Sequence, residues 1–131
     1  METECAETVS DETMLGLCRL MRVLFAPHRM DLFENIRFED TCAAFALSTD
    51  ECCFLIDRIR HSTLRDYHIL TQAVGKLAVK EPKARIFGIL LVGAAQEITP
   101  EFLRFGEKHR IALLKPAKVA GFIKKKLEIK T

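Results

Sequence analysis

The sequence lacks any long, uninterrupted run of apolar residues. None of its apolar stretches approaches the roughly 18 residues that a membrane-spanning helix needs, and the chain starts on an acidic stretch, Met1-Glu2-Thr3-Glu4, where a secretory signal would be basic. Glycine and proline are scarce, with 6 and 4 among 131 residues, which excludes a collagen-like or low-complexity chain. We therefore expect an intracellular protein, cytoplasmic or nuclear if the source is eukaryotic, that does not enter a membrane.

The cysteines lack the spacing of a metal site. The sequence has no Cys-x-x-Cys pair, and no histidine stands at zinc-ligand spacing beside a cysteine. The set is odd in number and consists of Cys5, Cys18, Cys42, Cys52 and Cys53. The last three fall among strand-like apolar residues, where a free thiol packs as a small apolar group. We expect reduced thiols and no bound metal.

What the sequence does contain is the composition of a packed domain with an uneven charge. Apolar residues make up 49% and charged residues 29%, which predicts a single domain over residues 1–131 with an acidic, flexible arm at residues 1–9. Five acidic residues and no lysine or arginine lie in residues 1–13, so the net charge of +2 leaves about +7 for the rest. A basic tail at residues 115–130 can attract phosphate backbones, or it can simply be a solvated helix face.

Hydrophobic periodicity predicts the elements of the first half. Ser10, two following carboxylates and an apolar stripe at three- and four-residue spacing predict a helix up to about Ala26, which Pro27 ends. Weak alternation over residues 31–40 predicts a strand. Apolar runs at residues 42–47 and 53–56, separated by the polar turn 48–51, predict a hairpin. A helix is expected over residues 63–79.

The second half changes period and then repeats the pattern. The unbroken apolar run at residues 86–92 predicts a strand covered on both faces, which we expect to be the central strand. Thr99 and Pro100 start a helix up to about His109, a short strand follows at 111–114, and a last helix spans about 116–129. Helices between strands require a partly parallel sheet. The fold class is therefore α/β, a mixed central sheet flanked by helices in the order αβββαβαβα.

The predicted core takes one apolar side chain or more from most of these elements. It consists of Met21, Leu24, Phe45, Leu55, Phe87, Ile89, Leu91, Leu113 and Phe122.

This order and several local patterns resemble the restriction-endonuclease-like superfamily of PD-(D/E)xK nucleases, which includes Mrr-type endonucleases and Holliday-junction resolvases. The resemblance covers about residues 10–125. It rests on Arg85-Ile86-Phe87-Gly88-Ile89-Leu90-Leu91-Val92 followed by Ile98-Thr99-Pro100-Glu101-Phe102, and on Arg110-Ile111-Ala112-Leu113-Leu114. Gln72 is similar in place to a glutamine that family members often carry. The resemblance implies a helix, a three-stranded meander, a helix, a strand, a helix and a final strand.

The resemblance also implies where a catalytic site would lie. The family uses an Asp on the second strand and an acidic-x-Lys triplet on the third to hold Mg²⁺ and activate water. If Asp57 matches the acidic residue, Ile59 falls where the lysine belongs and Ala44 where the metal-binding Asp belongs. Shifting the register by one makes Arg58 the cation but puts Ile56 at the carboxylate position. Neither alignment restores the triplet, so we expect a fold that has lost its metal site.

Two functions follow from this reading, with a third possibility outside the family. The first is a non-catalytic nuclease-like domain, with no catalytic residue and no cofactor, that binds nucleic acid or a protein of a nucleic-acid-processing assembly. Such domains often act as homodimers or within a complex. The alternative is an active Mg²⁺-dependent DNA endonuclease with a displaced metal site. It would use Asp57, a displaced ligand from Asp40 or Glu39, and Arg58 as the basic residue. The third is that the chain is another small α/β domain.

The residues expected to contact nucleic acid are arginines, lysines and one histidine, which is positively charged when protonated. In the family, the groove that faces DNA lies at and just after the third strand of the meander. In this chain most of the expected contact residues lie at that point, and the others lie on the last helix. They are Arg58, Arg60, His61, Arg65, Lys124 and Lys125. The same side chains could instead be solvated ends of a strand and of helices.

Overall fold

The computed structural model describes residues 9–38, 41–49, 51–59, 63–93 and 100–128. They form an α/β fold in which five strands make one mixed sheet in the order β1-β2-β3-β4-β5. The described elements follow the order αβββαβαβα that the sequence predicted, with two short 3-10 helices added. Among the described residues, no helix is both long and apolar enough to cross a membrane.

The first helix, α2 (Asp11–Phe25), begins where the sequence predicted. The Ser10 hydroxyl accepts a hydrogen bond from the backbone N–H of Thr13 at 3.1 Å, which satisfies one of the free donors of the first turn. Its apolar stripe is buried, and the helix gives way at Pro27 to the 3-10 helix η1 (Ala26–His28). Of the expected acidic arm, only Val9 lies within the described residues, and it is buried.

The meander consists of β1 (Asp31–Phe38), β2 (Thr41–Ser48) and β3 (Cys52–Arg58), paired antiparallel in sequence. The turn between β2 and β3 is held by Thr49, whose hydroxyl accepts hydrogen bonds from the backbone N–H groups of Glu51 and Cys52. This polar turn therefore sets the register of the hairpin, as its composition predicted.

The rest of the chain adds two parallel strands through crossover helices. Helix α3 (Thr63–Lys80) leads to β4 (Arg85–Leu91), which runs parallel to β3. Helix α4 (Pro100–His109) leads to β5 (Ile111–Leu114), parallel to β4. The chain then continues through η2 (Pro116–Lys118) into α5 (Val119–Lys126). The expected cap at Thr99 and the expected end of the last helix at Ile129 lie outside the described residues.

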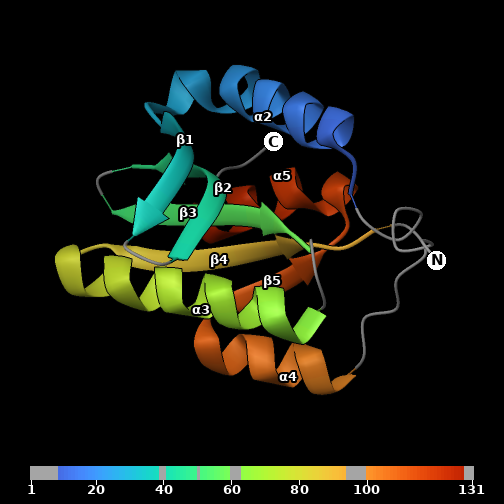
Figure 1. Cartoon of the computed structure of the whole chain (residues 1–131). Helices are drawn as coiled ribbons and strands as arrows, with labels where there is room; N and C mark the ends of the chain where they lie inside the picture. Colours follow the sequence, from blue (N-terminus) through green and yellow to red (C-terminus); the bar gives the residue numbers. More distant parts are fainter. Residues whose placement is uncertain (1–8, 39–40, 50, 60–62, 94–99, 129–131) are drawn as a thin grey trace.

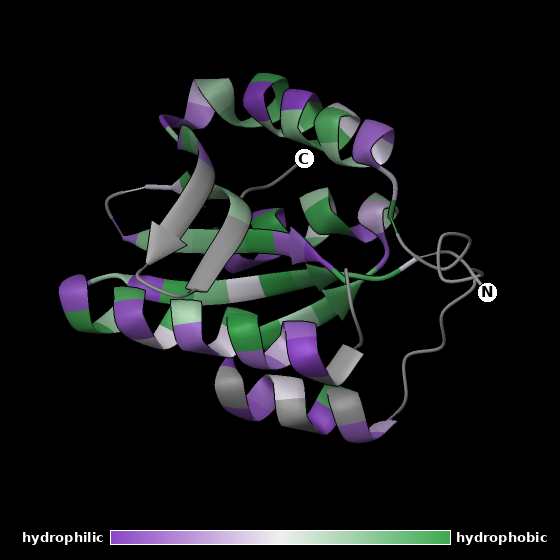
Figure 2. Cartoon of the chain, in the orientation of Figure 1, coloured by the Kyte–Doolittle hydropathy of each residue, from purple (hydrophilic) through white to green (hydrophobic). Residues whose placement is uncertain are grey.

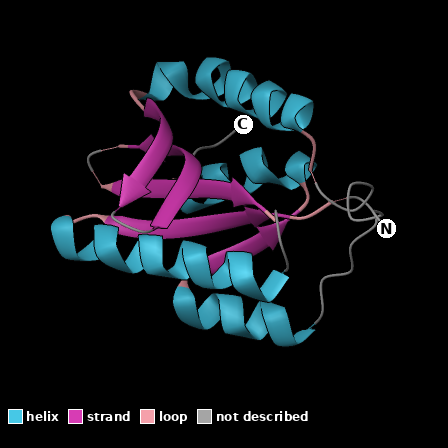
Figure 3. Ribbon diagram, in the orientation of Figure 1, coloured by secondary structure: helices cyan, strands magenta, loops and turns pink. Residues whose placement is uncertain are grey.

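Helices cover both faces of the sheet (Figures 1 and 3). Helices α2 and α5 contribute to one apolar cluster, which holds alternate residues of β3 such as Phe54 and Ile56. Helix α3 contributes to a second cluster on the other face, which holds Leu55. Helix α4 lies beside α3 against β5 (Figure 1). In Figure 2 the apolar residues concentrate on the inner strands between these layers.

Most of the predicted core is buried. Met21, Phe45, Leu55, Ile89, Leu91 and Leu113 are fully buried, and the other three, Leu24, Phe87 and Phe122, are partly buried at the edge of the first cluster. One prediction needs correction. The run at residues 86–92 forms β4, which is internal, but the middle strand of the sheet is β3. Both strands have helices on both faces, so apolar continuity alone could not distinguish them.

Candidate functional site

The site implied by the family resemblance lies at the end of β3. Asp57 is 6% exposed, next to Leu90 of β4, and one of its carboxylate oxygens accepts a hydrogen bond from the backbone N–H of Arg58 at 2.8 Å. Its neighbours by alternation along the strand, Leu55 and Ile59, belong to the apolar cluster under α3. Asp57 is therefore a buried carboxylate on the α3 side of the sheet.

The other two positions of the implied site are occupied by apolar side chains. The antiparallel register pairs Phe45 with Ile56, so Ala44 and Asp57 follow as the next residues on their two strands. Ile59 is 3% exposed among Tyr67, Leu70 and Val92. Its backbone N–H donates to the carbonyl oxygen of Leu91 at 3.2 Å, which extends the ladder between β3 and β4. Neither a methyl group nor a buried isoleucine can coordinate Mg²⁺ or exchange a proton with water.

A second buried carboxylate lies close in the chain and was not anticipated. Asp66, in the first turn of α3, is 6% exposed. Its place near the positive end of the helix dipole was the signal that could have identified it. Among the described residues, however, no group of three His, Cys, Asp or Glu side chains could hold a metal ion.

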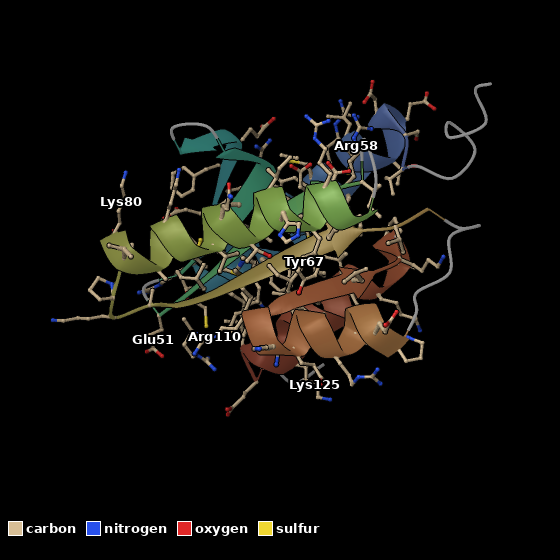
Figure 4. The ribbon with its side chains drawn as sticks, turned by 60° about the horizontal axis from the view of Figure 1, so that its bottom comes forward. Glu51, Arg58, Tyr67, Lys80, Arg110 and Lys125 are labelled. Carbon is tan, nitrogen blue, oxygen red and sulfur yellow. The ribbon has the colours of Figure 1, made fainter. Side chains whose placement is uncertain are left out.

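Arg58 lies on the other side of the sheet from Asp57. Its guanidinium donates to the carbonyl oxygen of Val9 through Nη1 at 2.7 Å and forms an ion pair with Asp11 through Nη2. The side chain of Arg58 is 23% exposed and that of Asp11 is 90% exposed. Figure 4 shows Arg58 beside the start of α2. Arg58 therefore ties the chain before α2 to the end of β3, over 47 residues or more of sequence.

The remaining predicted contact residues are dispersed. Arg65 is exposed on α3, whereas Lys124 is half-buried and Lys125 exposed on α5. Figure 4 shows Arg58 and Lys125 well apart on the molecule. Arg60, His61, Asp40 and Glu39 lie outside the described residues. Among the cations that the structure describes, Arg58, Arg65, Lys124 and Lys125 therefore come from separate elements, and their contact with nucleic acid stays a prediction.

Cys18, Cys52 and Cys53 are free and buried, as predicted for packed thiols. Burial raises the pKa of the Cys53 thiol to about 11, against a smaller opposing effect of a hydrogen bond with Ser48. Burial also raises the pKa of Cys18. A thiol that stays protonated at neutral pH is a poor nucleophile, so Cys18 and Cys53 serve packing.

A groove between α4 and α5, along β5, is the feature that sequence reasoning missed. It has a volume of about 500 Å³, and Phe87, Phe122, Arg110 and Lys126 are among its lining residues. We call it the α4–α5 groove.

Protein-family models, curated proteins and solved structures were compared with this chain, and none matches the chain. The function of the protein is therefore inferred from the residues of this chain and their geometry.

Proposed function

We propose that this protein is a nuclease-like domain that binds nucleic acid and does not cut it. The arrangement of its elements supports the proposal. A helix, a three-stranded meander, a helix, a strand, a helix and a final strand follow one another, which agrees with the plan of the restriction-endonuclease-like nucleases. A fold alone does not establish an activity, so the residues at the implied site decide between a cutting and a non-cutting domain.

The observation that carries the proposal is the composition of the three implied catalytic positions. These positions hold Ala44, which packs against the cluster of α2 and α5, Asp57, and Ile59, which belongs to the cluster under α3. Mg²⁺ needs several oxygen ligands, and one carboxylate with an adjacent methyl group supplies too few. The position of the lysine is filled by an isoleucine packed into the core. A nuclease that lost these groups keeps its shape and charge but has no means to activate water.

The alternative of an active endonuclease with a displaced metal site finds less support. It requires Arg58 to act beside Asp57, yet consecutive strand residues point to opposite faces. The guanidinium of Arg58 is engaged by Val9 and Asp11. Arginine is also a poor replacement for a catalytic lysine, because it does not readily share a proton with the attacking water.

The charge of the chain supports binding to a polyanion. Outside the first 13 residues the net charge is about +7, and cations attract nucleic acid by releasing counterions from its phosphates. Binding of this kind weakens steeply with salt, which distinguishes it from apolar association.

Cleavage assays test the absence of catalysis. Protein incubated with Mg²⁺ or Mn²⁺ and plasmid, single-stranded or branched DNA should release no more product than buffer. Asp57→Asn, which removes the surviving carboxylate at nearly constant volume, is the matched variant. Metal-dependent cleavage by the parent that Asp57→Asn abolishes would sink the non-catalytic proposal.

Paramagnetic Mn²⁺ provides an independent test of the same site. In an NMR spectrum of the parent, low Mn²⁺ should not selectively broaden the amide signals around residues 55–59, because the described part of the chain brings no group of three possible metal ligands together. Selective broadening that disappears in Asp57→Asn would mean that a metal site survives.

A further inference from the structure

The α4–α5 groove runs along the edge of the sheet. β5 pairs with β4 and is the last strand in the sheet order, with α4 and α5 on its two sides (Figures 1 and 3). Its walls come from β4, α4, β5 and α5, so segments far apart in the chain meet there. The volume of about 500 Å³ lies in the range of pockets that hold small ligands or single units of a polymer.

Two aromatic rings form part of the groove. Phe87 and Phe122 are both partly exposed, and their ring centroids lie 6.5 Å apart in an edge-to-face arrangement. Phe87 is held from behind by Phe54, which stacks on it at 5.5 Å. The Lys126 ammonium lies over both rings, 5.3 Å from the centroid of Phe87 and 5.4 Å from that of Phe122. The groove therefore combines apolar ring faces with a cation.

The elements around the groove carry much of the positive charge of the chain. Residues 100–128 contain eight lysines and arginines against three glutamates. Arg110 lines the groove and is exposed; it directly follows α4 and has a φ of 60°. Figure 4 shows Arg110 and Lys125 on the same part of the molecule. Glu107 is the opposing charge in the lining.

An added peptide strand is a poorer fit to this edge. β5 has only four residues, and α4 presses against its first one. A Cβ atom built on Gly106 would lie 2.2 Å from the carbonyl oxygen of Ile111, so the backbone of α4 sits directly against that group. Little of the edge is left for main-chain pairing with a partner strand.

We infer that the α4–α5 groove binds single-stranded nucleic acid. One base stacks on the ring of Phe122, whose plane is nearly perpendicular to that of Phe87, and Lys126 and Arg110 hold the phosphates on either side of it. A single strand fits because its bases are free to stack on aromatic side chains, whereas the bases of a duplex are already stacked. This inference rests on the proposed function and places its binding surface away from the end of β3.

The test is the anisotropy of a fluorescein-labelled oligothymidylate, titrated at several salt concentrations. Phe122→Leu keeps an apolar side chain but removes the ring, and it should weaken binding at least fivefold, since stacking of one base contributes about 1–3 kcal/mol. Phe122→Tyr keeps the ring and should bind within about twofold of the parent. Lys126→Gln should lower the slope of log K against log salt by about 0.7.

Arg19→Gln is the matched charge control. Arg19 is exposed on α2 and is not one of the residues that line the groove, and its removal changes the net charge as Lys126→Gln does. It should leave affinity and salt slope nearly unchanged. Glu107→Gln should tighten binding, because it removes the repulsive charge in the groove. Thermal melting of each variant shows whether it is folded, and Phe122→Tyr keeps the test valid if Phe122→Leu is not.

The outcomes separate this inference from the proposed function. If the parent binds the oligonucleotide but neither Phe122→Leu nor Lys126→Gln differs from Arg19→Gln, the groove is not the binding surface and the proposed function stands. If the parent binds neither the oligonucleotide nor a duplex at low salt, the proposed function fails and the groove assignment with it. Tighter binding of an oligoglutamate than of the oligothymidylate would make the groove an acidic-peptide site and overturn the inference.

Discussion

Replacing Ile59 by alanine should destabilise the domain, because the position of the implied catalytic lysine has become part of the core. Ile59 is 3% exposed and packs in the cluster under α3 with Tyr67, Leu70 and Val92. The substitution removes three carbon groups from this cluster, and each buried group contributes about 0.8 kcal/mol. The transfer term alone is therefore about 2.4 kcal/mol. A residual cavity adds to it, and we expect a total of about 3 kcal/mol.

Urea unfolding followed by circular dichroism measures this loss. With an m value of about 2 kcal/mol/M, the midpoint of Ile59→Ala should fall by about 1.5 M. Ile59→Val is the matched control, since it removes one carbon and should cost only about 0.5–1.5 kcal/mol. The ratio of the free-energy loss in Ile59→Ala to that in Ile59→Val measures how the side chain packs, and it does not depend on the overall stability of the domain.

If position 59 had the catalytic role of the lysine in the nuclease family, Ile59→Ala would give a different result. A catalytic side chain must reach solvent and substrate, so its truncation would change stability by less than about 0.5 kcal/mol. A midpoint of Ile59→Ala within error of the parent would refute the reasoning that this position is core. It would also reopen the end of β3 as a functional site.

Two further predictions concern glycines and pH. Gly106→Ala should lower the free energy of unfolding in urea by about 1–3 kcal/mol, because its Cβ would meet the Ile111 carbonyl oxygen at 2.2 Å. Gly75→Ala on α3, where no atom lies within 4 Å of the added Cβ, should raise the free energy of unfolding by about 0.5–1 kcal/mol. Equal effects of the two substitutions would contradict the contact. The free energy of unfolding should fall as pH rises from about 9 to about 11. Burial raises the pKa of the Cys53 thiol to about 11 in the folded state, whereas in the unfolded chain its pKa is 9.0. Between these values the thiol ionises in the unfolded chain and stays protonated in the folded protein. The contribution of Cys53 is about 2 kcal/mol at pH 11, and Cys53→Ala should remove it; parallel losses in parent and variant would show that other groups cause the fall.

The sequence by itself determined the elements and their order, because the signals for them are local. The Ser10 cap, the apolar stripe of α2 and the polar turn at Thr49 each act within a few residues of chain. The α/β class follows from helices placed between strands, since parallel neighbours need a crossover. Burial of Ile89 and Leu91 could be predicted from the same unbroken apolar run that predicted β4.

Part of the candidate site was also readable. Counting back across the hairpin by the family's usual spacing put Ala44 at the implied metal-ligand position, and in the structure the neighbouring Phe45 pairs with Ile56, the neighbour of Asp57. The hairpin itself could be predicted because pairing in a short hairpin is set by its turn. The same alternation puts Arg58 on the opposite face from Asp57, although the sequence grouped both at one strand end.

Only the tertiary structure decided which distant residues meet. Arg58 binds Val9 and Asp11, more than 40 residues away, and no local pattern encodes that choice. The middle position of β3 depends on strand order, which long-range pairing sets. The α4–α5 groove exists because β4, α4, β5 and α5 converge at one sheet edge and bring Phe87, Arg110 and Lys126 together. Such contacts are selected by packing among all elements at once, so they are properties of the folded chain and not of any segment.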